Sequence, residues 1–213
     1  MATILTPPVT IAQLLYRLGG IAPERVRLQP APGTAVEDDV ERCKYRNGQK
    51  YLLELVEGTL VEKVVGQYES QLAVLLTTEI GLYLSSYALG ILIGADGGHR
   101  LDFGLVRMPD VAFLSQARLA ALQNRPAVIP FAPDLAVEII SPGNTTGEMD
   151  RKLVEYFDAG VKLVWYVYPT TQTVMVYRHI DQPRELTADD TLDGDDVLPG
   201  FTLSIREWFS RAV

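Results

Sequence analysis

The alternation of apolar and polar positions changes character along the chain, and each change marks a predicted element. Residues 51–65 predict a hairpin that turns at Glu57-Gly58, because two apolar runs flank this polar pair. From residue 67 to residue 87 the apolar period becomes helical, which predicts one long helix with a buried stripe. The stripe consists of Leu72, Leu75, Leu76, Ile80 and Leu84.

The second half of the chain alternates strand-like and helical segments. Thr145 and Glu148 form a capping box, which predicts a helix over residues 146–159 between two strands. This strand–helix–strand order implies a parallel pair of strands joined by a right-handed crossover. The predicted fold class is therefore α/β (α+β), with a mixed central sheet flanked by helices. The strands are expected at 91–93, 105–114, 134–141, 161–168 and 173–177.

The first part of the chain has a looser pattern. Residues 9–19 predict a short helix capped by Thr10, and residues 36–46 a second short helix. A proline-bearing extended stretch separates them. We expect residues 1–45 to form an N-terminal helical arm and residues 46–213 to form the main domain.

Composition narrows the class of protein. The 213 residues are 47% hydrophobic and 22% charged, as in an ordinary globular protein. No apolar run reaches the roughly 18–20 residues of a membrane helix, and no secretory signal begins the chain, so a cytoplasmic location is expected. Cys43 is the only cysteine, which excludes a disulfide framework and a cysteine-rich zinc site.

The net charge of −8 argues against strong non-specific binding of nucleic acid. The charge is uneven, however. Six acidic residues and no basic residue lie in the stretch 185–196, which is expected to be an acidic loop, whereas Arg107, Arg118 and Arg125 accompany Asp110 in the stretch 107–130. A basic face elsewhere on the molecule and a uniformly acidic surface both remain open.

Two motifs are set aside. The glycine-rich segment 94–98 lacks the spacing of a phosphate-binding loop and predicts a turn. His99 and His179 are the only histidines, and no Gly-x-Ser-x-Gly elbow accompanies them. Both histidines are therefore expected at the surface.

Two carboxylates stand out among the polar residues. Asp110 follows Pro109 in the strand-like run 105–114, and proline lacks the N–H that a strand ladder needs, so the strand should break there. Glu138 lies inside a strand that is otherwise apolar, where an ionised carboxylate is costly unless it is paired or bound to a metal. Mg²⁺ prefers oxygen ligands and keeps several waters, so Asp110 and Glu138 would suffice to hold it.

Lys152 lies in the helix that follows the strand of Glu138, on a stripe between core and solvent with Glu148 and Tyr156. Its ammonium there can orient a metal-bound water or stabilise the charge of a phosphoryl transition state. A salt bridge to Glu138 or Glu148, and a lysine that extends along the surface, are the two structural alternatives.

These residues carry a resemblance to a known family. The runs 108–113, 133–142 and 152–161 resemble the family known as the putative restriction endonucleases, in the PD-(D/E)XK nuclease superfamily. The hairpin with Glu57-Gly58 and the closing segment 198–201 are also similar, so that the resemblance covers roughly residues 45–210.

The resemblance implies a restriction-endonuclease-like core in residues 46–213, with the catalytic set Asp110, Glu138 and Lys152. Asp110 and Glu138 would bind Mg²⁺ or Mn²⁺. Ile140 stands where the superfamily motif has lysine, and the resemblance is to a family whose lysine has moved to the following helix, here Lys152. Glu69 and Tyr156 are further candidates for the site.

The implied function is metal-dependent hydrolysis of phosphodiester bonds, with DNA as the expected substrate and a homodimer as the expected assembly. One alternative is a catalytically weak or inactive protein of the same fold that binds nucleic acid or protein. A metal-dependent hydrolase that is not a nuclease is another.

Overall fold

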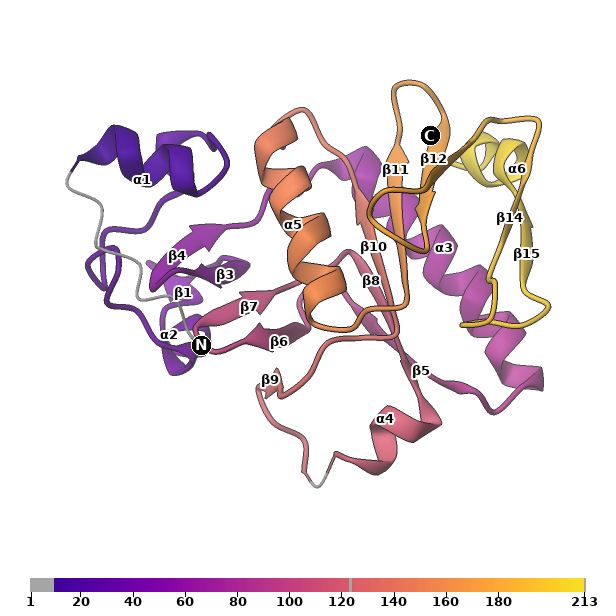
Figure 1. Cartoon of the computed structure of the whole chain (residues 1–213), viewed down its shortest axis with the longest axis horizontal. Helices are drawn as coiled ribbons and strands as arrows, with labels where there is room; N and C mark the ends of the chain where they lie inside the picture. The colour runs from indigo at the N-terminus through magenta and orange to yellow at the C-terminus, as the bar shows by residue number, and fades with distance from the viewer. Residues whose placement is uncertain (1–9, 123, 213) are drawn as a thin grey trace.

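The computed structural model describes residues 10–122 and 124–212, and most of its strands lie in two sheets (Figure 1). The larger sheet has the strand order β13-β12-β11-β10-β8-β5. β10 and β11 are parallel and all other neighbours are antiparallel, which confirms the predicted parallel pair. The strands are β5 (Gly90–Gly94), β8 (Val111–Ser115), β10 (Leu135–Ile139), β11 (Leu163–Tyr168), β12 (Thr173–Tyr177) and β13 (Pro183–Leu186).

The second sheet has five strands in the order β4-β3-β7-β6-β9. Its β3–β4 hairpin confirms the predicted one, and Glu57 and Gly58 both have positive φ, at 50° and 67°, as a tight hairpin turn requires. The strands are β3 (Leu53–Val56), β4 (Thr59–Glu62), β6 (Gly98–Asp102), β7 (Leu105–Arg107) and β9 (Val128–Ile129). Two small hairpins pair β1 (Tyr45–Arg46) with β2 (Gln49–Lys50), and β14 (Thr191–Asp193) with β15 (Thr202–Ser204).

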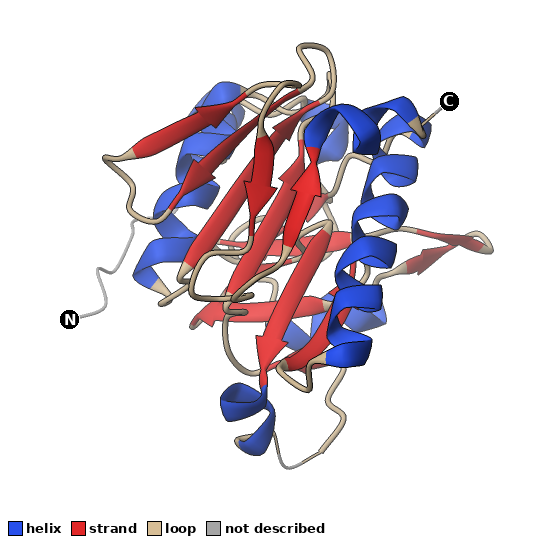
Figure 2. Ribbon diagram, turned by 90° about the vertical axis from the view of Figure 1, so that its right-hand side faces the viewer, coloured by secondary structure: helices blue, strands red, loops and turns tan. Residues whose placement is uncertain are grey.

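Helices cover both faces of the six-stranded sheet (Figures 1 and 2). On one face, α3 (Gln67–Ser86) and α6 (Ile205–Ser210) pack against the side chains of Val137 and Trp165. On the other face, α5 (Thr146–Asp158) packs against Ala136 and Val164. The long helix, the helix after Thr145 and its cap at Thr145 Oγ1 are thus confirmed.

The N-terminal elements pack on the five-stranded sheet rather than extending into solvent. Leu14 and Leu18 of α1 (Ile11–Arg17) share a cluster with Val56 and Val61 of the hairpin. Thr10 caps α1 as predicted. The second helix, α2 (Glu37–Arg42), ends earlier than expected, and a short 3₁₀ helix, Pro23–Arg25, precedes it. The division of the chain at residue 45 stays a prediction.

Pro109 breaks the strand-like run 105–114 as predicted, and the break separates two sheets. Residues before it form β7 in the five-stranded sheet, and residues after it form β8 in the six-stranded sheet. Ser115 then caps the short helix α4 (Gln116–Ala120). The chain therefore crosses from one sheet to the other at Pro109-Asp110, which places Asp110 at their junction.

Two expectations were wrong. The stretch 185–196 is not one loop, because it contributes the end of β13 and the whole of β14. His99 is not at the surface: its side chain is fully buried, and Nδ1 lies 3.2 Å from the carbonyl oxygen of Phe131. His179 is exposed, as expected. A buried histidine on β6 has no local sequence signal, because a contact with a loop distant in sequence creates its environment.

None of the helices in residues 10–122 and 124–212 combines the length and the apolar character that crossing a membrane requires.

The burial of His99 predicts a loss of stability in mild acid. Burial lowers the pKa of His99 to about 4, and the Phe131 carbonyl offsets this only in part. A histidine whose pKa is lower in the folded state contributes stability above its unfolded pKa of about 6.5 and loses it as pH falls toward 4. We expect this residue to cost roughly 3 kcal/mol of unfolding free energy at the acid end of this range. Denaturant unfolding at a series of pH values measures it.

The matched control for this prediction is the exposed histidine. His99→Gln should remove most of the pH dependence between about 6.5 and 4, and His179→Gln should leave the wild-type curve unchanged. Equal curves for wild type and His99→Gln would show that His99 is not the group responsible.

Candidate functional site

Asp110 is fixed by two hydrogen bonds to the neighbours of Glu138 on β10. Its backbone N–H donates to the Val137 carbonyl at 2.8 Å, and its Oδ2 accepts the Ile139 N–H at 2.7 Å. The two bonds bracket Glu138. Because Pro109 interrupts the ladder, the carboxylate of Asp110 takes the place of a backbone acceptor there. Asp110 therefore lies on a segment that adjoins the strand of Glu138.

Glu138 extends from β10 toward α5 and is almost wholly buried. Its Oε1 accepts hydrogen bonds from Lys152 Nζ at 3.0 Å and from the Tyr156 hydroxyl at 2.5 Å. Burial raises the pKa of Glu138, the Lys152 charge offsets this in part, and the nearby carboxylate of Asp110 raises it further. Among the described residues, Oε2 of Glu138 accepts no hydrogen bond.

Lys152 lies on α5 between two buried carboxylates. Its Nζ is 3.0 Å from Glu138 Oε1 and 3.1 Å from Glu54 Oε1, and the residue is 1% exposed. Burial alone would lower the pKa of Lys152, but the charges of Glu138 and Glu54 raise it above its usual value. The surface alternative for Lys152 is therefore wrong, and a salt bridge to Glu138 is present.

Glu54, on β3, is a member of this group that the sequence analysis missed. It is fully buried, with Arg107 Nη1 at 2.8 Å from Oε2 and the Met108 N–H at 3.0 Å from Oε1. Although burial opposes ionisation, the charges of Lys152 and Arg107 hold the pKa of Glu54 well below its usual value. The sequence signal for Glu54 was its charge between Leu53 and Leu55, in a hairpin strand with apolar positions on both faces.

Lys63 is the second residue that was missed. It follows β4, its Nζ is 2.8 Å from Asp110 Oδ1, and it also donates to the Met108 carbonyl. Lys63 is buried like Lys152, so two lysines serve two carboxylates: Lys63 contacts Asp110 and Lys152 contacts Glu138. We call Glu54, Lys63, Arg107, Asp110, Glu138, Lys152 and Tyr156 the buried charge cluster.

Comparison with known proteins identifies the family. The model of the Uma2 family, described as "Putative restriction endonuclease", matches residues 37–206. The chain belongs to the Uma2 family. The match spans every member of the buried charge cluster and confirms the family resemblance that the sequence motifs indicated.

A solved structure shows the same fold. The crystal structure of a putative nuclease belonging to DUF820 from Anabaena variabilis ATCC 29413 has a TM-score of 0.68 and 19% sequence identity. The alignment covers 76% of this chain and 92% of that chain. At this identity the likeness concerns the fold, and it confirms the mixed α/β architecture. No curated protein matches the chain significantly.

A cavity of about 300 Å³ opens beside the Asp110 end of the cluster. Asp110, Ile139 and Glu69 line it, together with residues of the segment 64–78 and the turn at Gly94 and Ala95. Glu69, from α3, thus shares the cavity with Asp110, but in the described part of the chain it forms no hydrogen bond or ion pair with the cluster. Its place in a Uma2 site stays a prediction.

The donor set was compared with what a divalent ion requires. Asp110 offers carboxylate oxygens to a cavity that can hold water, Glu138 is buried next to Ile139 of its lining, and Mg²⁺ is commonly held by one or two carboxylates and several waters. Within residues 10–122 and 124–212, no cluster of three or more His, Cys, Asp or Glu residues has the geometry of a metal site. The residues therefore fit a hydrated hard ion held by two carboxylates, and they do not fit zinc, which takes four close protein or water ligands.

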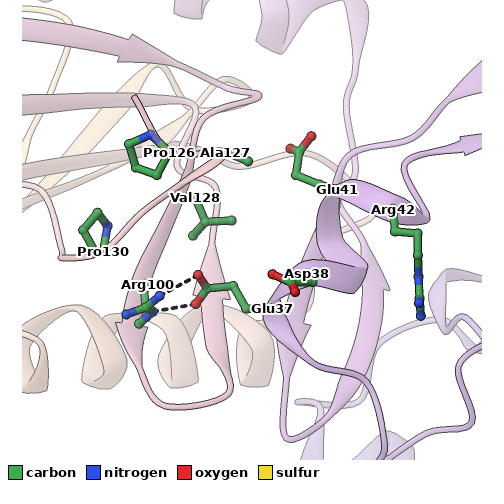
Figure 3. Close-up of a pocket in the computed structure, with 9 residues that line it drawn as sticks. All are labelled: Glu37, Asp38, Glu41, Arg42, Arg100, Pro126, Ala127, Val128 and Pro130. Carbon is green, nitrogen blue, oxygen red and sulfur yellow. Dashed lines mark hydrogen bonds and ion pairs between the residues drawn. The ribbon is translucent and has the colours of Figure 1, made fainter. Parts of the chain in front are cut away.

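A second hollow, of about 560 Å³, lies away from the cluster, between α2 and the segment leading into β9 (Figure 3). Glu37, Asp38 and Glu41 line it, and Glu37 forms a two-point ion pair with Arg100. None of the cluster residues contributes to this hollow, so it adds nothing to the chemistry described above.

Proposed function

We propose that this chain is a metal-dependent nuclease that hydrolyses phosphodiester bonds of DNA, with Asp110, Glu138 and Lys152 as its catalytic residues. The observation that supports it best is the bracketing of Glu138 by the two hydrogen bonds of Asp110 beside an open cavity. Membership of a family described as restriction endonucleases supports DNA as the substrate.

In this proposal the protein holds its two carboxylates in place before any ligand arrives. The Ile139 N–H fixes Oδ2 of Asp110, which leaves Oδ1 toward Lys63. Lys152 and Tyr156 both fix Oε1 of Glu138, which leaves Oε2 as the oxygen available for a ligand. Such preorganisation is useful because the carboxylates need no reorientation at the moment of reaction.

Mg²⁺ or Mn²⁺ held by Asp110 and Glu138 would supply an acidified water as the nucleophile and positive charge for the phosphate. Hydrolysis would join the water oxygen to phosphorus as the ester P–O bond breaks, with the attacking water giving up a proton to solvent and the leaving oxygen taking one up from solvent. The ammonium groups of Lys63 and Lys152 provide positive charge near the phosphate oxygens. A homodimer is part of the proposal, because cutting both strands of a duplex commonly uses two sites related by a two-fold axis.

The test is a titration of the wild-type chain with Mg²⁺ and with Mn²⁺, using supercoiled plasmid and single-stranded oligonucleotides as substrates. We expect cleavage that needs the ion, is lost on chelation and returns when the ion is restored. Binding of nucleic acid without cleavage at any ion concentration would favour the alternative, a protein of this fold that binds but does not cut.

A further inference from the structure

A groove of about 950 Å³ runs beside the β1–β2 hairpin, on the side of the molecule where α2 and β3 lie (Figure 1). Arginine and tyrosine side chains make up five of its eleven lining residues. Three arginines and one acidic residue, Glu24, contribute charge to it. Its lining includes Arg27, Arg42, Tyr45, Arg46 and Tyr51.

The charge of this segment differs from that of the whole chain. The ten residues 42–51 contain four basic and no acidic residues, in a chain whose net charge is −8. Arg46 is exposed and forms no ion pair with any described residue. The side chain of Arg42 is 72% exposed and pairs with the buried carboxylate of Asp39, and Figure 3 shows it directed away from the carboxylates of Glu37 and Glu41. Because a guanidinium has five N–H donors and this one is largely exposed, Arg42 can contact a phosphate while it keeps Asp39 as a partner.

Aromatic rings accompany these cations. Tyr45 is 62% exposed on β1, and the guanidinium of Arg27 lies over the ring of Tyr51, 4.2 Å from its centroid. Exposed rings among arginines are the feature by which proteins hold unpaired bases, because every base has a face that stacks on an aromatic ring while the cations contact phosphates. A duplex, whose bases are already stacked, gains nothing from an exposed tyrosine.

The groove adjoins the buried charge cluster through two consecutive residues. Glu62 pairs with Arg27 in the groove, and Lys63 pairs with Asp110 in the cluster. The backbone N–H of Lys63 also bonds to the carbonyl of Leu52, next to Tyr51. Val26 bridges to Val61 on the outer edge of β4, and the Arg27 N–H donates to the Leu60 carbonyl at 2.9 Å, so a wall of the groove is attached to the strand that leads to Lys63.

We propose that this groove binds a single-stranded segment of nucleic acid, with Tyr45 stacking on a base and Arg42 and Arg46 contacting phosphates. The proposal rests on the proposed function, since it concerns the substrate of that site. Its test nevertheless measures binding alone. The groove proposal can therefore be wrong while the protein cleaves nucleic acid, and it can be right while the protein does not cleave.

The experiment measures binding of a fluorescein-labelled oligothymidylate of twelve nucleotides by anisotropy, in chelator, over a range of salt concentrations. For the double variant Arg42→Gln/Arg46→Gln we expect at least a tenfold loss of affinity and a salt slope reduced by roughly 0.7 for each lost phosphate contact. Tyr45→Ala should lower affinity about tenfold and leave the salt slope unchanged, because stacking releases no counterions.

The matched control is Arg178→Gln/Arg206→Gln, which removes the same charge from two exposed arginines on other elements. It should bind as the wild type does. Equal losses of affinity in the two double variants would mean that only net charge matters, and would overturn the proposed binding groove. Wild-type affinity in Arg42→Gln/Arg46→Gln would overturn it too, and so would the absence of binding by the wild type. Thermal melting of each variant verifies that it is folded.

Discussion

Asp110→Asn and Glu138→Gln are each expected to abolish divalent-ion binding and to lower the cleavage rate by about a thousandfold or more. Both substitutions keep the size of the side chain and remove one negative charge. In the proposed site the ion is held by Asp110 and Glu138, so the loss of either leaves a single anionic ligand, which is too weak for a hydrated ion in competition with water. Calorimetric titration with Mn²⁺ and single-turnover cleavage at saturating Mn²⁺ measure the two effects separately.

The two variants should differ from each other in stability. Burial raises the pKa of Glu138, so the folded state disfavours the ionised carboxylate. The free energy of unfolding therefore falls as pH rises from the unfolded pKa toward the raised folded pKa. Glu138→Gln is therefore expected to unfold no more easily than the wild type at neutral pH. Asp110→Asn replaces a carboxylate oxygen that contacts Lys63 and should lower the unfolding free energy by about 1–3 kcal/mol.

Asp134→Asn is the control for these variants. Asp134 is also a buried carboxylate in ion pairs, with Lys162 at 2.8 Å and Arg118 at 3.3 Å, but it lies just before the other end of β10. Asp134→Asn should reduce stability and keep Mn²⁺ affinity. If all three variants bind Mn²⁺ like the wild type, Asp110 and Glu138 are not the ligands.

Local sequence patterns were sufficient for the elements that carry the site. The period of apolar residues predicted α3 and α5, and the missing N–H of Pro109 predicted the break that exposes Asp110. A charged residue inside an apolar strand predicted that Glu138 needs a partner. These signals are local: each depends on residues within a few positions of one another.

The partners of these residues were beyond the reach of the same patterns. Lys63 meets Asp110 across 47 positions, where the chain crosses from one sheet to the other. Arg107 meets Glu54 across 53 positions, because β3 and β7 are neighbours in the five-stranded sheet. Glu54 carried the same signal as Glu138, a charge among apolar neighbours. It was overlooked because a hairpin strand at a domain edge usually exposes one face, whereas both faces of β3 are covered.

The arrangement of charge explains how an acidic chain can have a nucleic-acid substrate. The acidic excess includes Asp189, Asp190 and Asp196 near β14, which belongs to a separate small hairpin. The basic residues of segment 42–51 lie on the β1–β2 hairpin and just before it, and the cluster itself contains three cations and three carboxylates. Because charges are screened beyond a Debye length of about 8 Å, the local charge of a surface decides its attraction for nucleic acid more than the net charge of the chain does.

Lys152→Met is expected to lower both stability and cleavage, and a second substitution separates the two effects. The change keeps most of the side-chain volume and removes the ammonium that Glu54 and Glu138 share. Two buried carboxylates then lose a partner, and breaking a buried pair in this way costs about 3–5 kcal/mol of unfolding free energy. The cleavage rate should fall by roughly two to three powers of ten, the effect of one lost electrostatic donor.

Adding Glu54→Gln to Lys152→Met should restore part of the lost stability, because it removes one of the two buried carboxylates that lost the ammonium, while Arg107 keeps its partner Glu155 at 2.7 Å. Cleavage by the double variant should stay low, since the ammonium beside Glu138 is still absent. Denaturant unfolding and single-turnover cleavage, the latter well below the melting temperature, measure the two quantities. A double variant that regains stability and also cleaves at the wild-type rate would show that Lys152 serves the fold alone. Recovery of stability without cleavage would place its ammonium in the chemistry.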